Sequence, residues 1–308
     1  MWVNNEIISA IKKTVIEGQV LTEAPMSEYT SFKTGGSADC LVIPGNETEL
    51  IDVMTLISGT ETEFLVIGAG TNLLVRDAGY RGIIIRLSKK LGGIDISGQR
   101  ICVQAGAALP ELAVCARDAA LTGLEFSAGI PGTVGGGIYM NAGAFGGEIS
   151  RIFISARVFL NNEIVTLGHS EMDFRYRHCI LKENKGVVLD AVFELSKGDK
   201  SQITHFMQEI SRQRKEKQPL DLPSAGSFFK RPQGSFASKL IEEAGLSGLS
   251  VGGAEISPMH AGFIVNHGGA KASDIIDLME IVRNTVFERS GIMLEPEVHI
   301  IGEISNDM

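Results

Sequence analysis

The most informative segment for the fold reads Phe64-Leu-Val-Ile-Gly-Ala-Gly-Thr-Asn-Leu-Leu-Val75. Four apolar residues of strand length run directly into Gly68-Ala-Gly70, a pattern that a tight turn after a strand also produces. Leu73 stands where the third glycine of a Rossmann fingerprint belongs, and no Gly-Lys-Ser/Thr follows as in a P-loop. The stretch therefore predicts a strand and a glycine loop of neither of these two nucleotide-binding types.

A second glycine cluster lies further along the chain. It reads Gly129-Ile-Pro-Gly-Thr-Val-Gly-Gly-Gly137 and is followed by Asn141-Ala-Gly-Ala-Phe-Gly-Gly147. Ordinary turns need only one or two glycines each, whereas successive backbone N–H groups without side chains can cradle a pyrophosphate. Two such loops predict one long, phosphate-containing ligand between them. Close strand packing at a crossover is the alternative reading of the same glycines.

The rest of the chain predicts an α+β protein in three segments, 1–90, 91–200 and 201–308. In the first we expect strands at 40–43, 64–67 and 83–87 and helices over 6–16 and after Asn46, an N-cap with Glu49 completing a capping box. In the second we expect a helix over 110–121 and strands at 101–104, 152–160 and 187–195. Apolar residues alternate along the strand 152–160, at Ile152, Ile154, Ala156, Val158 and Leu160. In the third we expect helices over 203–217 and 235–244, a long helix N-capped by Ser273, and a strand over 298–304.

Composition excludes several classes of function. The chain has 308 residues, 44% of them hydrophobic and 21% charged, with a net charge of −9, so a basic nucleic-acid binder is not expected. No apolar run reaches the roughly 18–20 residues of a membrane span, and the N-terminus does not resemble a signal peptide. The four cysteines form no CxxC pair and suit a reducing compartment. We therefore expect a cytoplasmic protein that does not bind nucleic acid.

A series of motifs makes the chain similar to a known family. They are Ser31-Phe-Lys-Thr-Gly-Gly36, the two glycine stretches, Met140-Asn-Ala-Gly143, Phe174-Arg-Tyr-Arg-His-Cys179, Lys217-Gln-Pro-Leu220, Pro223-Ser-Ala-Gly-Ser-Phe-Phe-Lys230, Ala261-Gly-Phe-Ile-Val-Asn266 and Leu294-Glu-Pro-Glu-Val298. Together they resemble the UDP-N-acetylenolpyruvoylglucosamine reductases, in the family's order from about residue 30 onward. The resemblance implies an NADPH-dependent flavoenzyme that reduces UDP-N-acetylglucosamine enolpyruvate to UDP-N-acetylmuramate for peptidoglycan synthesis.

The resemblance also implies a fold and a cofactor. The family binds FAD noncovalently in a two-lobed domain of the p-cresol methylhydroxylase type, here 1–90 and 91–200. Residues 201–308 would form an α+β substrate domain whose last strand returns toward the flavin. No histidine or cysteine lies in residues 31–38 or in the first glycine loop, which argues against covalent attachment there. The residues expected to hold FAD are Ile67, Gly68, Ala69, Gly70, Thr71, Asn72, Gly129, Ile130, Pro131, Gly132, Gly135, Gly136 and Asn141.

Three residues are the expected catalytic set: Arg177, Ser227 and Glu297. Each has an ordinary reading by itself, as a surface arginine, a turn serine and a solvated glutamate. In the family, hydride addition to the enolpyruvyl β-carbon is followed by protonation of the α-carbon, which is assigned to the position of Ser227. Arginine suits the enolate that develops, because its fork matches a carboxylate and stays charged. Glu297 is expected to act as a protonated acid or as a polarising hydrogen-bond partner.

Further residues carry expectations about ligands. Lys217 matches a family contact to the UDP-sugar, although it also belongs to the charged run 212–217. Lys230 and Asn266 are the other candidate substrate contacts. No metal is expected, because the histidines and cysteines form no ligand cluster with the usual spacing. We expect a monomer with a small-molecule substrate as its partner.

The chain also departs from the family pattern. His299 follows Glu297-Val298, where many relatives have arginine, which predicts weaker or pH-sensitive anion binding. The region 177–217 is too short for the extra tyrosine-bearing loop of the longer family type, so the chain resembles the shorter type.

Two other functions remain open at this stage. One is another FAD oxidoreductase of the same fold, such as an alcohol or lactone oxidase, against which the set of Arg177, Ser227 and Glu297 argues. The other is a flavin- or nucleotide-binding module without turnover. That module would keep both glycine loops and tolerate the loss of Ser227.

Overall fold

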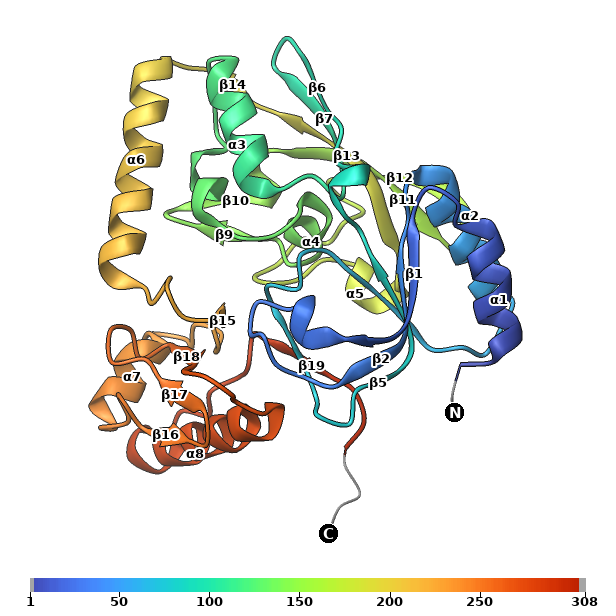
Figure 1. Cartoon of the computed structure of the whole chain (residues 1–308). Coiled ribbons are helices and arrows are strands. Elements are labelled where there is room, and N and C mark those ends of the chain that lie inside the picture. The colour runs from blue at the N-terminus through green and yellow to red at the C-terminus, as the bar shows by residue number, and fades with distance from the viewer. Residues whose placement is uncertain (1–2, 305–308) are drawn as a thin grey trace.

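The computed structural model describes residues 3–304 and places their elements in three packed parts (Figure 1). The first part is a four-stranded sheet in the order β1-β2-β5-β3. Its strands are β1 (Gln19–Pro25), β2 (Ser37–Ile43), β5 (Tyr80–Arg86) and β3 (Phe64–Ile67). β1 runs antiparallel to β2, while β2, β5 and β3 are parallel. The strands expected in this segment are confirmed.

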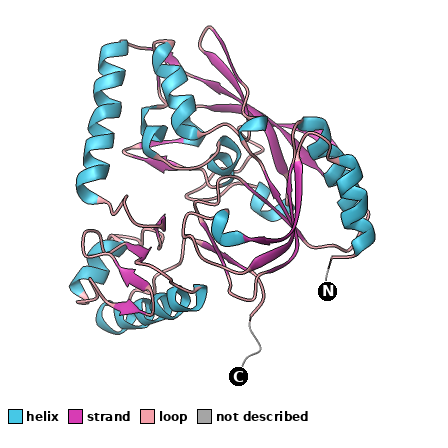
Figure 2. Ribbon diagram, in the orientation of Figure 1, coloured by secondary structure: helices cyan, strands magenta, loops and turns pink. Residues whose placement is uncertain are grey.

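The parallel strands of this sheet are apolar on both faces. Residues 40–42 of β2 and 83–85 of β5 are fully buried, as expected for strands covered on both sides. α1 (Asn5–Thr14) and α2 (Glu47–Ser58) pack against each other and stand on the outer side of the sheet (Figure 2). η1 (Met26–Glu28) and η2 (Lys89–Leu91) are single turns beside it.

The second part is an antiparallel sheet in the order β12-β11-β13-β7-β6. Its strands are β6 (Ile94–Ser97), β7 (Arg100–Gln104), β11 (Phe153–Leu160), β12 (Glu163–Gly168) and β13 (Val187–Glu194). The helical elements around it are α3 (Leu109–Asp118), η3 (Glu125–Gly129), α4 (Val134–Tyr139), η4 (Ile149–Arg151) and α5 (Leu181–Asn184). Short strand pairs β8 (Leu121–Thr122) with β14 (Ser196–Lys197), and β9 (Gly143–Ala144) with β10 (Gly147–Glu148), complete this part.

The predicted alternation along residues 152–160 is wrong in its first half. Phe153 is buried and Ile154 is exposed, whereas Ala156 and Val158 are buried as the alternation requires. β11 pairs with β13 through two irregularities, one between Phe153 and Ser155 and one between Arg157 and Val158. Each bulge shifts which side chains face the core, and an alternation read from the sequence cannot follow that shift.

The helix α6 (Lys200–Lys217) packs against η3 and α3, elements of the second part, and stands beside them in Figure 1. Asp199 caps it by accepting a hydrogen bond from the backbone N–H of Gln202. The segment division at residue 200 stays a prediction. We propose that the C-terminal domain begins after Lys217, because the helix before it shares the packing of the second part.

The third part is a small antiparallel sheet in the order β15-β18-β17-β16. Its strands are β15 (Ser224–Ser227), β18 (Phe263–Asn266), β17 (Ala254–Ile256) and β16 (Ser250–Val251). α8 (Ala272–Ser290) packs on it, and α7 (Ala237–Glu243) packs against α8. Ser273 was expected to cap α8, but this is wrong: the cap position is Lys271, whose backbone N–H donates to Asp274.

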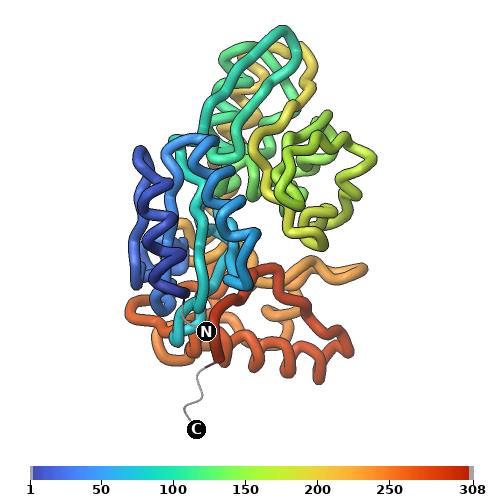
Figure 3. Tube along the Cα trace, turned by 90° about the vertical axis from the view of Figure 1, so that its right-hand side faces the viewer, coloured from blue at the N-terminus to red at the C-terminus, as the bar shows by residue number. Residues whose placement is uncertain are grey.

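The last strand leaves this third part. β19 (His299–Ile301) pairs in parallel with β4 (Leu73–Val75), directly after the first glycine loop. Figure 3 shows the residues that follow α6 at one end of the molecule, next to the preceding parts. No helix among residues 3–304 is both long enough and apolar enough to cross a membrane.

Candidate functional site

A cavity of about 1190 Å³ lies where the three parts meet. Its wall includes residues 64–73, 128–133 and 135–137, the segment 218–227, and side chains from α6, α5 and β19. Pockets for drug-sized ligands usually measure about 300–1,000 Å³. The cavity therefore has room for a dinucleotide and part of a second ligand.

The first glycine loop offers free hydrogen-bond donors to this cavity. The hydrogen bonds of the described residues include none donated by the backbone N–H groups of residues 68–72. Gly70 has φ +67°, and a Cβ at this position would overlap the carbonyl oxygen of Tyr29. Only glycine fits there, because it alone combines a left-handed backbone with no side chain. The loop is thus built as a backbone cradle, as its sequence predicts.

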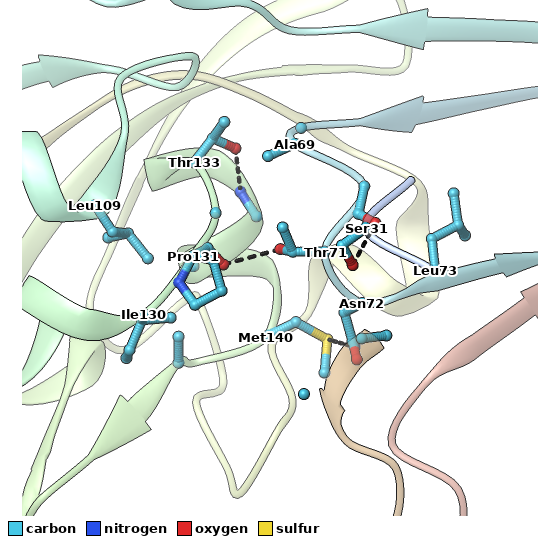
Figure 4. A pocket seen from close by; sticks show the side chains of 18 of the residues that line it. Ser31, Ala69, Thr71, Asn72, Leu73, Leu109, Ile130, Pro131, Thr133 and Met140 are labelled. Carbon is cyan, nitrogen blue, oxygen red and sulfur yellow. Dashed lines mark hydrogen bonds between the residues drawn. The ribbon is translucent and has the colours of Figure 1, made fainter. Parts of the chain in front are cut away.

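The two glycine loops touch each other (Figure 4). The hydroxyl of Thr71 donates to the carbonyl oxygen of Pro131 at 2.9 Å. A Cβ on Gly68 would overlap the hydroxyl of Thr133, which itself accepts a hydrogen bond from the N–H of Gly136. The glycines therefore agree with both predictions from the sequence. They allow the two loops to pack closely, and they leave backbone exposed along one wall of the cavity.

The structure brings the expected cofactor residues to this wall with one exception. Asn141 is buried outside the cavity lining, where its amide donates to the carbonyl of Arg175 and accepts from the N–H of Ser150. Its place is therefore in the support of the loop that carries Arg177. The residues that line the cavity are Ile67, Gly68, Ala69, Gly70, Thr71, Asn72, Gly129, Ile130, Pro131, Gly132, Gly135 and Gly136.

Arg177, Ser227 and Glu297 converge on the same cavity. Nε of Arg177 donates to Oε1 of Glu297 at 2.7 Å, and the two side chains are only 21% and 16% exposed. The guanidinium also lies over the ring of Tyr176, with Cζ 5.1 Å from the ring centroid. This geometry is that of an ion pair, so it favours the polarising role of Glu297 over the protonated one.

Backbone pairing holds Ser227 beside Glu297. The N–H of Glu297 donates to the carbonyl of Phe228 at 2.8 Å, one residue after Ser227. The side-chain amide of Asn72 donates to the carbonyl of Glu297 at 3.1 Å. The first glycine loop, the end of β15 and the start of β19 are therefore fastened to one another at this point.

Comparisons with known proteins show the family of this chain. Residues 218–301 match the family described as UDP-N-acetylenolpyruvoylglucosamine reductase, C-terminal domain, and residues 38–168 match an FAD binding domain family. A reductase of that name from Caldanaerobacter subterraneus is 45% identical over 298 residues, which cover 96% of this chain and 98% of the relative. The Pediococcus pentosaceus reductase is 48% identical over 93% of this chain and 96% of its own. The chain belongs to the UDP-N-acetylenolpyruvoylglucosamine reductase family.

A solved structure supports the same assignment. The reductase of this family from Thermus caldophilus superposes with a TM-score of 0.79 at 36% identity, covering 92% of this chain and 98% of its own. The expected α+β class, with an FAD-binding domain followed by a C-terminal domain, is confirmed. Membership of a flavoenzyme family, which the motifs indicated, is confirmed as well.

The three residues expected to contact the substrate lie outside the cavity lining, namely Lys217, Lys230 and Asn266. Lys217 is exposed at the end of α6, and Lys230 forms an ion pair with Glu295. The amide of Asn266 makes three hydrogen bonds within the protein: it donates to the carbonyl of Phe32 and accepts from the N–H groups of Gly268 and Ala270. Asn266 therefore joins the C-terminal sheet to the first part. A substrate role for these residues stays a prediction.

Sequence reasoning missed several residues of the cavity wall. Lys182, Tyr139 and Arg214 line it together with His299, which the sequence marked only as a departure from the family. Burial lowers the pKa of Lys182, of Arg214 and of His299, and it raises the pKa of Tyr139. Lys182 lies only five residues after Arg177 in the chain. This closeness to a predicted catalytic residue was the available sign that Lys182 also lies near the site.

One group of carboxylate and imidazole side chains lies outside the cavity. Asp173, His178 and Glu183 bring their ligand atoms close enough together for a metal. The guanidinium of Arg175 lies among them, with Nη2 2.6 Å from Asp173, 2.8 Å from the ring of His178 and 3.4 Å from Glu183. A cation is thus already present at their centre.

Proposed function

We propose that this protein reduces UDP-N-acetylglucosamine enolpyruvate to UDP-N-acetylmuramate with NADPH as the hydride donor. The observation that carries the proposal is the meeting of Arg177, Ser227 and Glu297 on the wall that the two glycine loops also form. The relatives that resemble the whole chain are named as reductases of this UDP-sugar, which supports the same substrate.

The cavity fits a noncovalently bound FAD. The free N–H groups of residues 68–72 suit a pyrophosphate, and glycines keep the wall clear of side chains. The residues that line the cavity include no cysteine, and His299 is the histidine among them. Bound FAD would supply the two-electron chemistry between NADPH and the enolpyruvyl group. Residues 67–72, 129–132, 135 and 136 would hold it.

The side chains of this wall would act on the substrate itself. Arg177 would oppose the negative charge that develops on the enolpyruvyl carboxylate. Glu297 would orient the Arg177 guanidinium through the 2.7 Å contact. The Ser227 hydroxyl would donate the proton to the α-carbon, and the charged neighbours would help a group that is a poor acid alone.

The cellular setting follows from the same proposal. A UDP-sugar precursor of peptidoglycan is made in the cytoplasm, and the four free cysteines of this chain suit a reducing compartment. We therefore propose a cytoplasmic enzyme that acts as a monomer, with Lys217, Lys230 and Asn266 as its candidate contacts to the nucleotide sugar.

Replacing Ser227 by alanine separates the two half-reactions. We expect Ser227→Ala to leave reduction of the bound flavin by NADPH nearly unchanged, because no proton is needed from this residue. Reoxidation by the enolpyruvyl substrate should slow by about 10²- to 10⁴-fold, the usual contribution of a positioned proton donor. Stopped-flow absorbance of each half-reaction measures both rates. Ser201→Ala, an exposed serine on α6, is the matched control.

Anaerobic visible absorption of the purified protein tests the function as a whole. Bleaching by NADPH and recovery on addition of the UDP-sugar would establish cofactor, donor and acceptor together. Bleaching without recovery would retain the flavin and remove the proposed substrate. Equal slowing of both half-reactions in Ser227→Ala would assign Ser227 to binding or folding instead of proton donation.

A further inference from the structure

Lys182 places a half-buried ammonium at the catalytic end of the cavity. Its Nζ donates to the carbonyl of Arg177 at 2.8 Å and lies 3.2 Å from Sδ of Met140 and 5.2 Å from the ring centroid of Tyr139. An ammonium has three N–H donors, and a thioether is only a weak acceptor. The group therefore keeps capacity to bind a further acceptor in the cavity that it lines.

Two neighbouring cations are already paired with carboxylates. Arg177 is paired with Glu297, and Lys230 is paired with Glu295. Burial and the nearby Lys182 and Lys230 lower the pKa of His299, so this imidazole is neutral at pH 7. The ion pairs of the described residues include none made by Lys182. Lys182 is thus a cation of this wall for which the described residues supply no carboxylate partner.

We propose that Lys182 is a second cation, beside Arg177, that binds the carboxylate of the enolpyruvyl group. The proposal rests on the proposed function and deepens it, since it assigns the recognition of the one anionic group beside the reacting double bond. Glu297 offsets part of the charge of Arg177. An unpaired ammonium beside it, in a partly desolvated site, adds to the attraction of the same carboxylate.

A pair of ligands that differ in the carboxylate tests this assignment. Calorimetric titration of the oxidised, FAD-loaded protein, without NADPH, gives Kd for UDP-N-acetylglucosamine enolpyruvate and for UDP-N-acetylglucosamine. We expect Lys182→Met to weaken the first ligand by about 10- to 100-fold and the second by less than about 2-fold. Lys182→Arg should restore most of the affinity. Lys13→Met removes the same charge from exposed α1 and should change neither Kd.

The pH dependence of the unmodified protein is a second test that needs no variant. Affinity for the carboxylate ligand alone should fall as pH rises, and it should do so below the pH at which an ordinary lysine titrates, because burial lowers the pKa of Lys182. The groups that face Lys182 are Arg177, Glu297, Lys230, His299, Tyr139 and Cys179. Burial raises the pKa of Tyr139 and raises that of Cys179 to about 11. Neither the phenol nor the thiol therefore loses its proton before Lys182 does.

Three outcomes would overturn the assignment. Equal weakening of both ligands by Lys182→Met, with loss of FAD, would show that the lysine only supports the backbone of Arg177. An unchanged Kd for the carboxylate ligand would show that the lysine does not contact it. Failure of the unmodified protein to bind either UDP-sugar would instead contradict the proposed function from which this inference starts.

Discussion

At the scale of single residues, the backbone of Arg177 is the most informative feature. Its φ is +55°, in the left-handed region that residues with a side chain rarely adopt. Lys182 holds its carbonyl, and Arg175 and His178 exchange backbone hydrogen bonds across it. Such conformations persist at functional sites because the surroundings fix them. The turn aims the guanidinium at Glu297, which no spacing in the sequence could show.

His299 makes a residue-scale prediction about pH. Its pKa is lowered by burial in the folded protein, so between that value and about 6.5 the unfolded chain binds more protons. The stabilising contribution of neutral His299 is therefore complete above pH 6.5 and is lost as pH falls. We expect His299→Gln to lose less stability between pH 7 and pH 5 than the unmodified protein does. Urea unfolding at each pH measures this difference.

His205 provides the control for this experiment, because it is exposed on α6. His205→Gln should retain the full loss of stability at low pH. The same steep loss in His299→Gln would contradict the argument and would assign the effect to other groups.

At the scale of elements, Glu49 shows how a capping motif is used by the tertiary structure. Asn46 caps α2 as expected, since its side chain accepts from the N–H of Glu49. The other hydrogen bond of the expected capping box, from the backbone N–H of Asn46 to the carboxylate of Glu49, is wrong. The carboxylate of Glu49 accepts instead from the N–H groups of Gly45, Ile16 and Glu17, at 2.7, 2.7 and 2.6 Å. It thereby ties the end of α1 to the start of α2.

Removing this carboxylate should weaken the first part of the molecule. Burial works to raise the pKa of Glu49, but the backbone N–H groups outweigh it and the pKa lies below its ordinary value. Its contribution is therefore present above about pH 4.5 and is lost as pH falls. We expect Glu49→Gln to lower the free energy of unfolding by about 2 kcal/mol at pH 7 and by less at pH 4. Glu61→Gln, at an exposed site, should change it little at either pH, and similar losses in both variants would refute the role of these hydrogen bonds.

At the scale of the whole molecule, side chains of the first part fasten the C-terminal domain in place. Both oxygens of Asp77 accept hydrogen bonds from the start of α8, from the N–H of Ala272 at 2.8 Å and of Ser273 at 2.9 Å. Asn266 reaches back to the carbonyl of Phe32, and β19 pairs with β4. These contacts hold Ser227 and Glu297 opposite the glycine loops, so the interface between the domains also forms a wall of the candidate site.

Asp77 therefore makes a prediction about the assembled molecule. We expect Asp77→Ala to lower the free energy of unfolding by about 1 kcal/mol, the usual cost of a lost N-cap. Because the domain that carries Ser227 would be held less firmly, Kd for the UDP-sugar should rise while FAD stays bound. Thermal unfolding and calorimetry measure the two effects. Asp95→Ala, on exposed β6, is the control, and an unchanged Kd in Asp77→Ala would show that docking does not depend on this cap.

Sequence patterns alone were enough to predict the strands at 40–43, 64–67 and 83–87, the family, and the set of Arg177, Ser227 and Glu297 that meets in the cavity. These features depend on local patterns: apolar runs, glycines without alternatives, and short motifs. The register of β11, the cap of α8, the contacts of Glu49 and the neighbours of Lys182 depend instead on how the folded chain packs. Each of these joins residues far apart in the chain through a bulge, a carboxylate or a backbone carbonyl. Such contacts form only when packing brings the partners together, so no periodicity along the chain records them.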